Sequence, residues 1–296
     1  MRDLLKIWLA QMRQSTIDSR SRFPNDAGDA VFLSPHCDDI CFSLGALTHR
    51  LQAGILLNVF SKSGHVARVD LAPQQLAALF ESGSPDSQTL GLSPRPEAAE
   101  AWVNWVTKLR SGEDEAFAEA CGLRRVELNL PEAPLRAQHP FKGQSSAKDA
   151  LDVETALMGA LSDLAAATKG TRPWLFCPAG IGGHIDHLLV RDAILKRLGE
   201  LQRLYRIAFY EDLHYASGRL KRWRGLAEFH AAARMLDLSR IKLPMLDGGD
   251  EKLRLVHLYA SQLTPDLMDI ACYSPPASRR TGLHEAVWSA SASGVV

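Results

Sequence analysis

The 296-residue sequence predicts an α/β protein with a Rossmann-like fold, in which helices cover both faces of a mostly parallel sheet. Two observations lead to this prediction. Short apolar runs recur along the chain, and segments with helical periodicity separate them. Hydrophobic residues make up 46% of the chain and charged residues 23%, which are the proportions of a globular protein with a substantial core.

Each predicted element begins or ends at turn residues or at a change of periodicity. The predicted strands span residues 30–33, 55–60, 125–130, 174–177 and 205–210. The predicted helices span residues 4–17, 40–53, 113–121, 152–167, 184–201, 226–236 and 252–263. Residues 64–110, rich in proline, glycine and serine, are expected to form loops, either around a substrate entrance or as a plain surface excursion.

No internal repeat or linker divides the chain, so residues 1–296 are predicted to form a single domain. An N-terminal helix is expected within residues 1–22. The small, polar residues 289–296 are expected to form a frayed tail.

The charge and the cysteines exclude several classes of protein. Lys and Arg together number 34, as do Asp and Glu, so no excess of positive charge favours nucleic-acid binding. The five scattered cysteines include no CxxC pair, which favours free thiols in a reducing, cytoplasmic setting. Neither a signal peptide nor a membrane span is expected, because charged residues interrupt the apolar runs. The oligomeric state is left open.

The first candidate site follows the predicted strand 30–33. His36 and Asp39 stand three residues apart at a strand-to-helix turn, where both can project to one side. An imidazole and a carboxylate at that spacing suit a zinc ion. Asp38, between them, can point into the same pocket. The alternative is a helix N-cap, for which aspartate is a preferred residue.

The second candidate site follows the predicted strand 174–177, again at a strand-to-helix turn. It is glycine-rich, and its His184 and His187 are three residues apart. The alternative is a turn with one capping and one surface histidine. Ligand sites in parallel sheets form at the carboxyl ends of strands, so the two turns can meet.

Together the two turns contain enough ligands for a catalytic metal. Three nitrogen or oxygen ligands and a water molecule make up such a zinc site. His36, Asp39 and His187 supply the three, and Asp38 and His184 remain beside them as an acid–base pair.

The two motifs, Pro35-His36-x-Asp38-Asp39 and Gly183-His184-x-Asp186-His187, resemble those of the LmbE-like family of de-N-acetylases, which includes the PIG-L-type enzymes. Weaker similarity covers residues 110–114, 210–213 and 259–262. Two positions depart from the commonest pattern: Cys37 replaces a frequent proline, and Ile40 a frequent glutamate.

The resemblance implies a Zn²⁺ ion, or another divalent metal, on His36, Asp39 and His187. It implies that Asp38 is the general base and that His184 assists the oxyanion or the leaving group. Asp186 is implied to lie behind the ligands, where a carboxylate fixes an imidazole tautomer; its alternative role is a charge at a helix start.

Seven further residues are candidates for substrate binding. Positions at helix starts or strand ends suggest them, although solvated or core positions are the alternative for each. They are His65, Arg110, Glu113, Asp114, Tyr210, Glu211 and Asp212.

The expected reaction is hydrolysis of the N-acetyl group of an amino sugar or an N-acetylglucosamine-containing conjugate. Two alternatives remain open. The same metal chemistry would cleave a non-sugar amide or an ester, and a protein that had lost catalysis would only bind carbohydrate.

Overall fold

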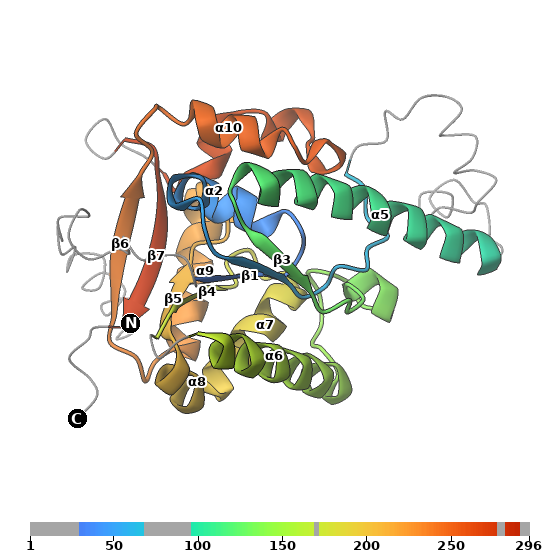
Figure 1. Ribbon diagram of the computed structural model, residues 1–296, viewed down its shortest axis with the longest axis horizontal. Coiled ribbons are helices and arrows are strands. Elements are labelled where there is room, and N and C mark those ends of the chain that lie inside the picture. The colour runs from blue at the N-terminus through green and yellow to red at the C-terminus, as the bar shows by residue number, and fades with distance from the viewer. Residues whose placement is uncertain (1–29, 68–95, 169–171, 277–281, 291–296) are drawn as a thin grey trace.

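The computed structural model describes residues 30–67, 96–168, 172–276 and 282–290. The expected N-terminal helix and residues 291–296 of the expected tail lie outside these ranges. Within them the central feature is a seven-stranded sheet in the order β3-β2-β1-β4-β5-β7-β6 (Figure 1). Its strands are β1 (Val31–Ser34), β2 (Ile55–Asn58), β3 (Arg124–Glu127), β4 (Trp174–Pro178), β5 (Arg206–Tyr210), β6 (Leu238–Pro244) and β7 (His284–Ala290).

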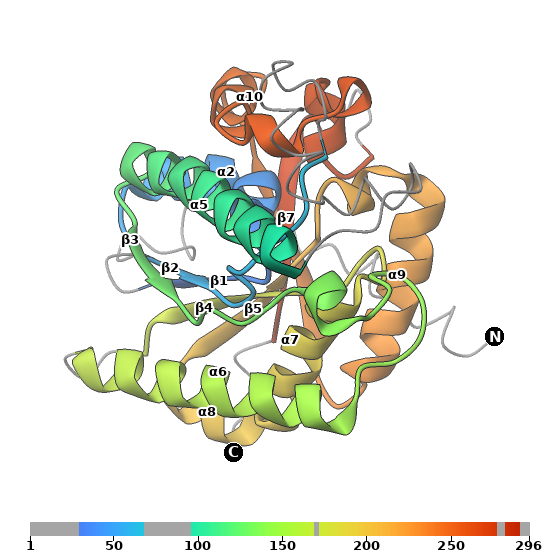
Figure 2. The ribbon, with the colours of Figure 1, turned by 90° about the vertical axis from the view of Figure 1, so that its right-hand side faces the viewer.

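The predicted fold class is confirmed. Five strands, β1 to β5, pair in parallel. One layer of helices on the sheet contains α2 (Asp39–Leu51), α5 (Pro96–Ala120) and α10 (Asp250–Val256). The opposite layer contains α6 (Ala147–Ala167), α7 (Ile185–Lys196), α8 (Leu198–Leu204) and α9 (Arg219–Ala232). Figure 2 shows the sheet between these layers.

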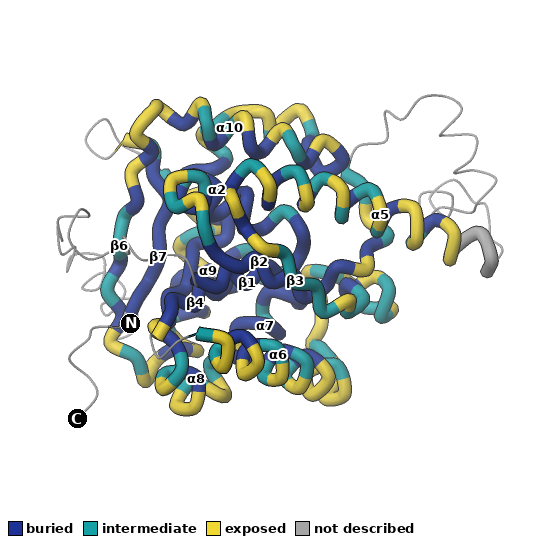
Figure 3. The backbone as a smooth tube through the Cα atoms, viewed as in Figure 1, coloured by how far each residue is buried: buried dark blue, intermediate teal, exposed yellow. Residues whose placement is uncertain are grey.

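The central strands are apolar at successive positions because both of their faces are buried. In β1, Val31 and Leu33 pack into the core on the α6–α7 side, whereas Phe32 packs into the core on the α2 side. Figure 3 shows the buried strands in the middle of the molecule and exposed residues on the outer sides of the helices. This explains why these strands show no polar–apolar alternation. Among the described residues, no helix is long and apolar enough to cross a bilayer.

The structure corrects the sequence prediction at the C-terminal edge of the sheet. β6 and β7 were not predicted, and both pair antiparallel. The frayed tail was expected to begin at Ser289, but Ser289 pairs with Ala208 and Ser239 inside the sheet. β6 contains Arg240, which is 7% exposed and pairs with Glu211, so its sequence lacks the pattern of an apolar strand.

Several helix boundaries also differ. α5 begins at Pro96, so the second part of the predicted loop region 64–110 is helical. Residues 68–95 of that region lie outside the described ranges. The predicted helix 184–201 is divided into α7 and α8 at Arg197. α10 ends at Val256, and the 3-10 helix η3 (Ala260–Gln262) follows it. The other 3-10 helices are η1 (Ala133–Arg136), η2 (Tyr215–Ser217), η4 (Pro265–Leu267) and η5 (Ile270–Tyr273).

Helix α2 contains a break that a buried carboxylate stabilises. Leu44 leaves the helical conformation (φ −133°, ψ 19°). The backbone N–H groups of Ala46 and Leu47 donate to the two oxygens of Glu285, at 2.8 and 2.9 Å. Lys252, fully buried, forms an ion pair with the same carboxylate. Glu285 of β7 therefore caps the second half of α2 as an N-cap residue would.

Lys252→Met is expected to lower the free energy of unfolding by about 3–5 kcal/mol, because it leaves the Glu285 charge buried without its partner. Urea denaturation followed by circular dichroism measures the change. Lys148→Met, which breaks the exposed Lys148–Asp152 pair, is the control and should change stability little. Equal changes in the free energy of unfolding for the two substitutions would show that the buried pair stabilises the protein no more than the exposed one.

Candidate active site

The two sequence motifs meet at the carboxyl ends of neighbouring strands. The segment 35–39 follows β1 and the segment 180–187 follows β4, and β1 pairs directly with β4. Strand order reverses between these two strands, since the chain goes to β2 and β3 on one side of β1 and to β4 and β5 on the other. Such a reversal is where open α/β sheets form ligand sites.

Three potential ligand atoms form a compact triangle at this position. His36 Nδ1 lies 3.3 Å from Asp39 Oδ2 and 3.3 Å from His187 Nε2. His187 Nε2 lies 3.2 Å from Asp39 Oδ2. All three residues are at least nine-tenths buried. The ligand set inferred from the sequence is therefore brought together in space.

Two buried carboxylates fix the orientation of the imidazoles. His36 Nε2 lies 3.0 Å from Asp186 Oδ2, and His187 Nδ1 lies 2.8 Å from Asp212 Oδ1. Asp186 is itself held by the backbone N–H of Ala133 at 2.9 Å. Each carboxylate accepts the ring N–H that faces away from the triangle, which leaves the other nitrogen with a free lone pair pointing inward. This is the arrangement in which histidine ligates metals.

The triangle fits a metal ion by size. Ligand atoms roughly 2.0–2.1 Å from a tetrahedral zinc ion lie about 3.3–3.4 Å from one another. The three distances between the ligand atoms match this spacing. The donor set of two imidazoles and one carboxylate is also typical of zinc and other divalent first-row metals.

The triangle also fits a metal ion by charge. Burial lowers the pKa of His36, but hydrogen bonds to Asp186 and Asp39 outweigh it and raise that pKa to about 9. Burial also opposes the charge on His187, yet Asp39 and Asp212 raise its pKa well above the usual value. Surroundings that favour a proton on both imidazoles favour any cation, and a metal ion would replace those protons.

His184 lies beside the triangle as the N-cap residue of α7. Its Nδ1 accepts the backbone N–H of Asp186 at 3.2 Å, so the neutral ring carries its proton on Nε2. Its ring stands edge-on to His36, with centroids 4.7 Å apart. Potential ligand atoms of His36, His184 and His187 all lie within 4.8 Å of one another. His184 can therefore donate to a molecule bound at the metal site, or ligate in a different protonation state.

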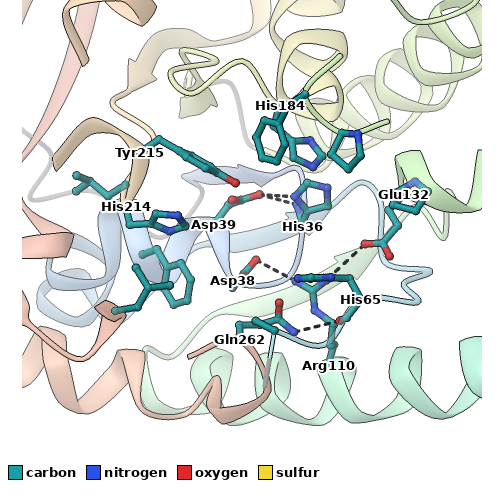
Figure 4. A pocket seen from close by; sticks show the side chains of 17 residues that line it. His36, Asp38, Asp39, His65, Arg110, Glu132, His184, His214, Tyr215 and Gln262 are labelled. Atoms are coloured by element: carbon teal, nitrogen blue, oxygen red, sulfur yellow. Dashed lines mark hydrogen bonds and ion pairs between the residues drawn. The ribbon is translucent and has the colours of Figure 1, made fainter. Parts of the chain in front are cut away.

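Asp38 occupies the N-cap position of α2, but its side chain makes no capping hydrogen bond. Its Oδ1 instead accepts from Arg110 Nη2 at 3.1 Å. Arg110, only 3% exposed, is held from the other side by Ser63 Oγ at 2.9 Å and lies 3.6 Å from Glu132. The capping alternative for Asp38 is thus not realised, and Arg110 orients its carboxylate toward the pocket (Figure 4).

These groups line a pocket with a volume of about 210 Å³. Its lining combines charged and polar side chains with aromatic and apolar ones, and Figure 4 shows how these side chains surround it. The lining residues are His36, Asp38, Asp39, Phe42, His65, Ala67, Arg110, Glu132, Pro134, Pro140, Phe141, His184, Leu213, His214, Tyr215, Gln262 and Leu267.

Of the seven substrate-binding candidates, His65 and Arg110 line this pocket and the other five do not. Glu113 accepts hydrogen bonds from the backbone and the hydroxyl of Ser261, both at 2.7 Å. Asp114 accepts from Tyr259 at 2.8 Å and from Asn58 at 2.6 Å. These two carboxylates connect α5 to other parts of the fold.

The three candidates at the end of β5 also have partners inside the protein. The Tyr210 hydroxyl donates to the Leu33 carbonyl at 3.0 Å. Glu211 is fully buried and pairs with Arg222 and Arg240. Asp212 holds His187, as described above. The end of β5 was therefore informative for Asp212, whose carboxylate orients His187 and does not line the pocket.

Several pocket residues were not singled out as site residues from the sequence, among them Glu132, Phe141, His214 and Tyr215. Glu132 follows β3 at its carboxyl end, the same signal that indicated the other candidates, and its carboxylate accepts from Ser63 and from the Gly64 backbone at 2.9 and 2.7 Å. Phe141, 50% exposed, lies in a segment without regular periodicity, so no local pattern could have indicated it.

Asp212→Asn is expected to weaken metal binding by about 10- to 100-fold, because the amide removes the negative charge that supports His187. Titration with Zn²⁺ against a competing chelator measures the affinity. Asp163→Asn, an exposed position on α6, is the control. An unchanged affinity in Asp212→Asn would show that His187 does not need this carboxylate.

Comparisons with known proteins found deacetylases among the similar sequences and structures. No protein-family model matches the chain. The chain is 28% identical over 251 residues to the 2'-N-acetylparomamine deacetylase of Streptomyces fradiae, and the match covers 79% of this chain and 74% of that enzyme.

Solved structures share the fold. The A40926 pseudoaglycone deacetylase superposes with a TM-score of 0.57 at 18% identity, covering 92% of this chain and all of that chain. A deacetylase of the teicoplanin biosynthesis pathway superposes with a TM-score of 0.57 at 18% identity, covering 90% of this chain and all of that chain. The teicoplanin deacetylase is also known in a zinc-inhibited form, with a TM-score of 0.55 at 18% identity and the same coverage. The relative and these solved structures are deacetylases by name, and the fold they share with this chain agrees with the resemblance noted in the sequence.

Proposed function

We propose that this protein is a metal-dependent N-deacetylase that acts on an N-acetylated amino sugar or its conjugate. The observation that carries the proposal is the triangle of His36, Asp39 and His187, with the Asp38 carboxylate and the His184 ring in the same pocket. The similarity to the 2'-N-acetylparomamine deacetylase supports both the reaction and the substrate class. We further propose that the whole chain forms one catalytic domain and that it acts in the cytoplasm, where the free thiols of its cysteines would persist.

His36, Asp39 and His187 would hold the metal, Zn²⁺ in the first instance. When bound, a metal of this kind polarises the acyl carbonyl and lowers the pKa of a water molecule toward about 7. Asp38 takes a proton from the attacking water, and its contact with Arg110 keeps the carboxylate aimed at that water. The Nε2–H of His184 is available to donate to the oxygen that gains negative charge.

Transfer of the proton taken from the water to the departing nitrogen completes the reaction. As the C–N bond breaks, protonated Asp38 or His184 delivers a proton to the departing nitrogen. Water thus adds OH to the acyl carbon and H to the nitrogen, and the products are acetate and a primary amine. The aromatic residues of the pocket support a sugar as the amine component, since Phe141 and Tyr215, with ring centroids 6.0 Å apart, offer surface to the apolar face of a sugar ring.

The test is acetate release by the purified protein after loading with Zn²⁺, Co²⁺ or Mg²⁺, at several metal-to-protein ratios. The substrate panel contains free N-acetyl amino sugars, their glycosides and sugar nucleotides, with a simple N-alkyl acetamide and an aryl acetate ester beside them. Turnover of N-acetyl sugars that depends on the metal supports the proposal. Preferential turnover of the simple amide or the ester would overturn the sugar assignment, and no turnover with any metal would overturn the reaction.

A further inference from the structure

Tyr215 is the first residue of η2. In the parts of the chain that the structure describes, no backbone or side-chain group bonds to its hydroxyl. The side chain lines the pocket. Figure 4 shows its hydroxyl pointing toward the carboxylate of Asp39, which belongs to the metal-ligand triangle. A molecule that enters the pocket can therefore accept a hydrogen bond from this phenol.

The ring of Tyr215 is held tightly against the second metal-site turn. Gly182 has a positive φ of 103°, and a Cβ at that position would lie 2.5 Å from Tyr215 Cγ. Any side chain at residue 182 would therefore occupy the space that the Tyr215 ring fills. The ring also stands edge-on to His187, with centroids 6.1 Å apart, and contacts His214, with centroids 4.4 Å apart.

The backbone before Tyr215 is anchored to the same site. Asp212 accepts from the Ile181 N–H at 2.8 Å while it holds His187, and its own carbonyl accepts from the Ala216 N–H at 2.8 Å. The N–H of Leu213 donates to Ser43 Oγ of α2 at 3.1 Å. The hydroxyl is thus fixed relative to the metal ligands before any substrate binds, which is the condition for electrostatic stabilisation of a transition state.

We propose that Tyr215 is a further catalytic residue, whose hydroxyl donates a hydrogen bond to the acyl oxygen as that oxygen becomes negatively charged. The inference rests on the proposed deacetylase function. It adds a donor that comes from the segment after β5, whereas His184 comes from the segment after β4. A donor that bonds more strongly to the developing oxyanion than to the neutral carbonyl raises kcat without a matching change in KM.

The test compares Tyr215→Phe, which removes only the hydroxyl, with the wild-type protein. Tyr205→Phe is the matched control, because Tyr205 is buried on the α6 side and its hydroxyl donates to the Leu161 carbonyl, away from the pocket. Three quantities are measured for each protein: the metal affinity, kcat and KM for the best N-acetyl sugar, and the affinity for a methylphosphonamidate analogue. In this analogue a tetrahedral, anionic phosphorus group replaces the acetyl group.

In Tyr215→Phe, kcat and the affinity for the analogue are expected to fall on the order of 100-fold. KM, metal affinity and the affinity for the amine product should stay close to their wild-type values. Wild-type kcat and analogue affinity in Tyr215→Phe would overturn the inference. Weaker metal binding, with kcat restored at saturating metal, would also overturn it, because the hydroxyl would then act on Asp39. A wild-type protein that releases no acetate would refute the proposed function itself, whatever residue 215 does.

Discussion

Asp38→Asn lowers the rate of acetate release by about a hundred- to ten-thousandfold while the protein keeps its metal. This is the expected result because the amide has no basic oxygen to take the proton of the attacking water. The substitution preserves shape, and the amide oxygen can still accept from Arg110. Steady-state kinetics and metal analysis by mass spectrometry on the same samples give the two quantities.

Asp152→Asn is the matched control, since Asp152 lies on α6 with a half-exposed side chain and forms an ion pair with the exposed Lys148. Its kcat should equal that of the wild-type protein. A near-normal rate in Asp38→Asn would assign the proton transfer to another group, with His184 as the next candidate. Loss of metal in Asp38→Asn would place Asp38 among the ligands.

Replacing His187 by alanine removes one corner of the ligand triangle, and we expect metal affinity to fall by more than about 100-fold, with turnover lost in proportion. Three protein ligands are the smallest set that catalytic zinc sites commonly use, so no spare donor compensates fully. Competition with a fluorescent chelator gives the affinity. Treating the wild-type protein with a chelator should abolish turnover in the same way, and adding back metal should restore it.

His257→Ala serves as the control because His257 is exposed at the end of α10. Its metal stoichiometry should match the wild type. Full metal occupancy in His187→Ala would instead indicate a ligand set built on His36 and His184, whose potential ligand atoms also lie within 4.8 Å of each other. Spectroscopy of the Co²⁺-loaded variants would then separate the two ligand sets.

The parallel half of the sheet could be predicted from local sequence, and the triangle of His36, Asp39 and His187 from two local motifs together with the topology of parallel sheets. Val31, Phe32 and Leu33 form a continuous apolar strand, and the polar residues that follow mark its carboxyl end. The pattern of His36 and Asp39 at one turn and His187 at another indicates a metal centre, and the strand pairing of β1 with β4 brings the two turns together.

The antiparallel edge could not be predicted in the same way because its charged residues are buried in pairs. Arg240 in β6 and Glu285 in β7 look like surface residues in the sequence, yet Glu211 and Lys252 neutralise them inside the protein. Only the last part of the long α5 was predicted, as the helix 113–121, because its beginning at Pro96 lies in a proline-rich segment that is typical of a loop. Tyr215 was missed because only tertiary packing against Gly182 places its ring in the pocket.

The pairing of β1 with β4 has a thermodynamic consequence. His36 and His187 are distant in sequence, and they become neighbours only when the strands between them have assembled, so an unfolded chain offers no comparable cation site. Ion binding and global folding are then linked equilibria. Once the free metal concentration exceeds the dissociation constant, each further tenfold increase in that concentration adds about 1.4 kcal/mol to the stability of the native state. The melting temperature of the protein would accordingly report the free metal concentration in its surroundings.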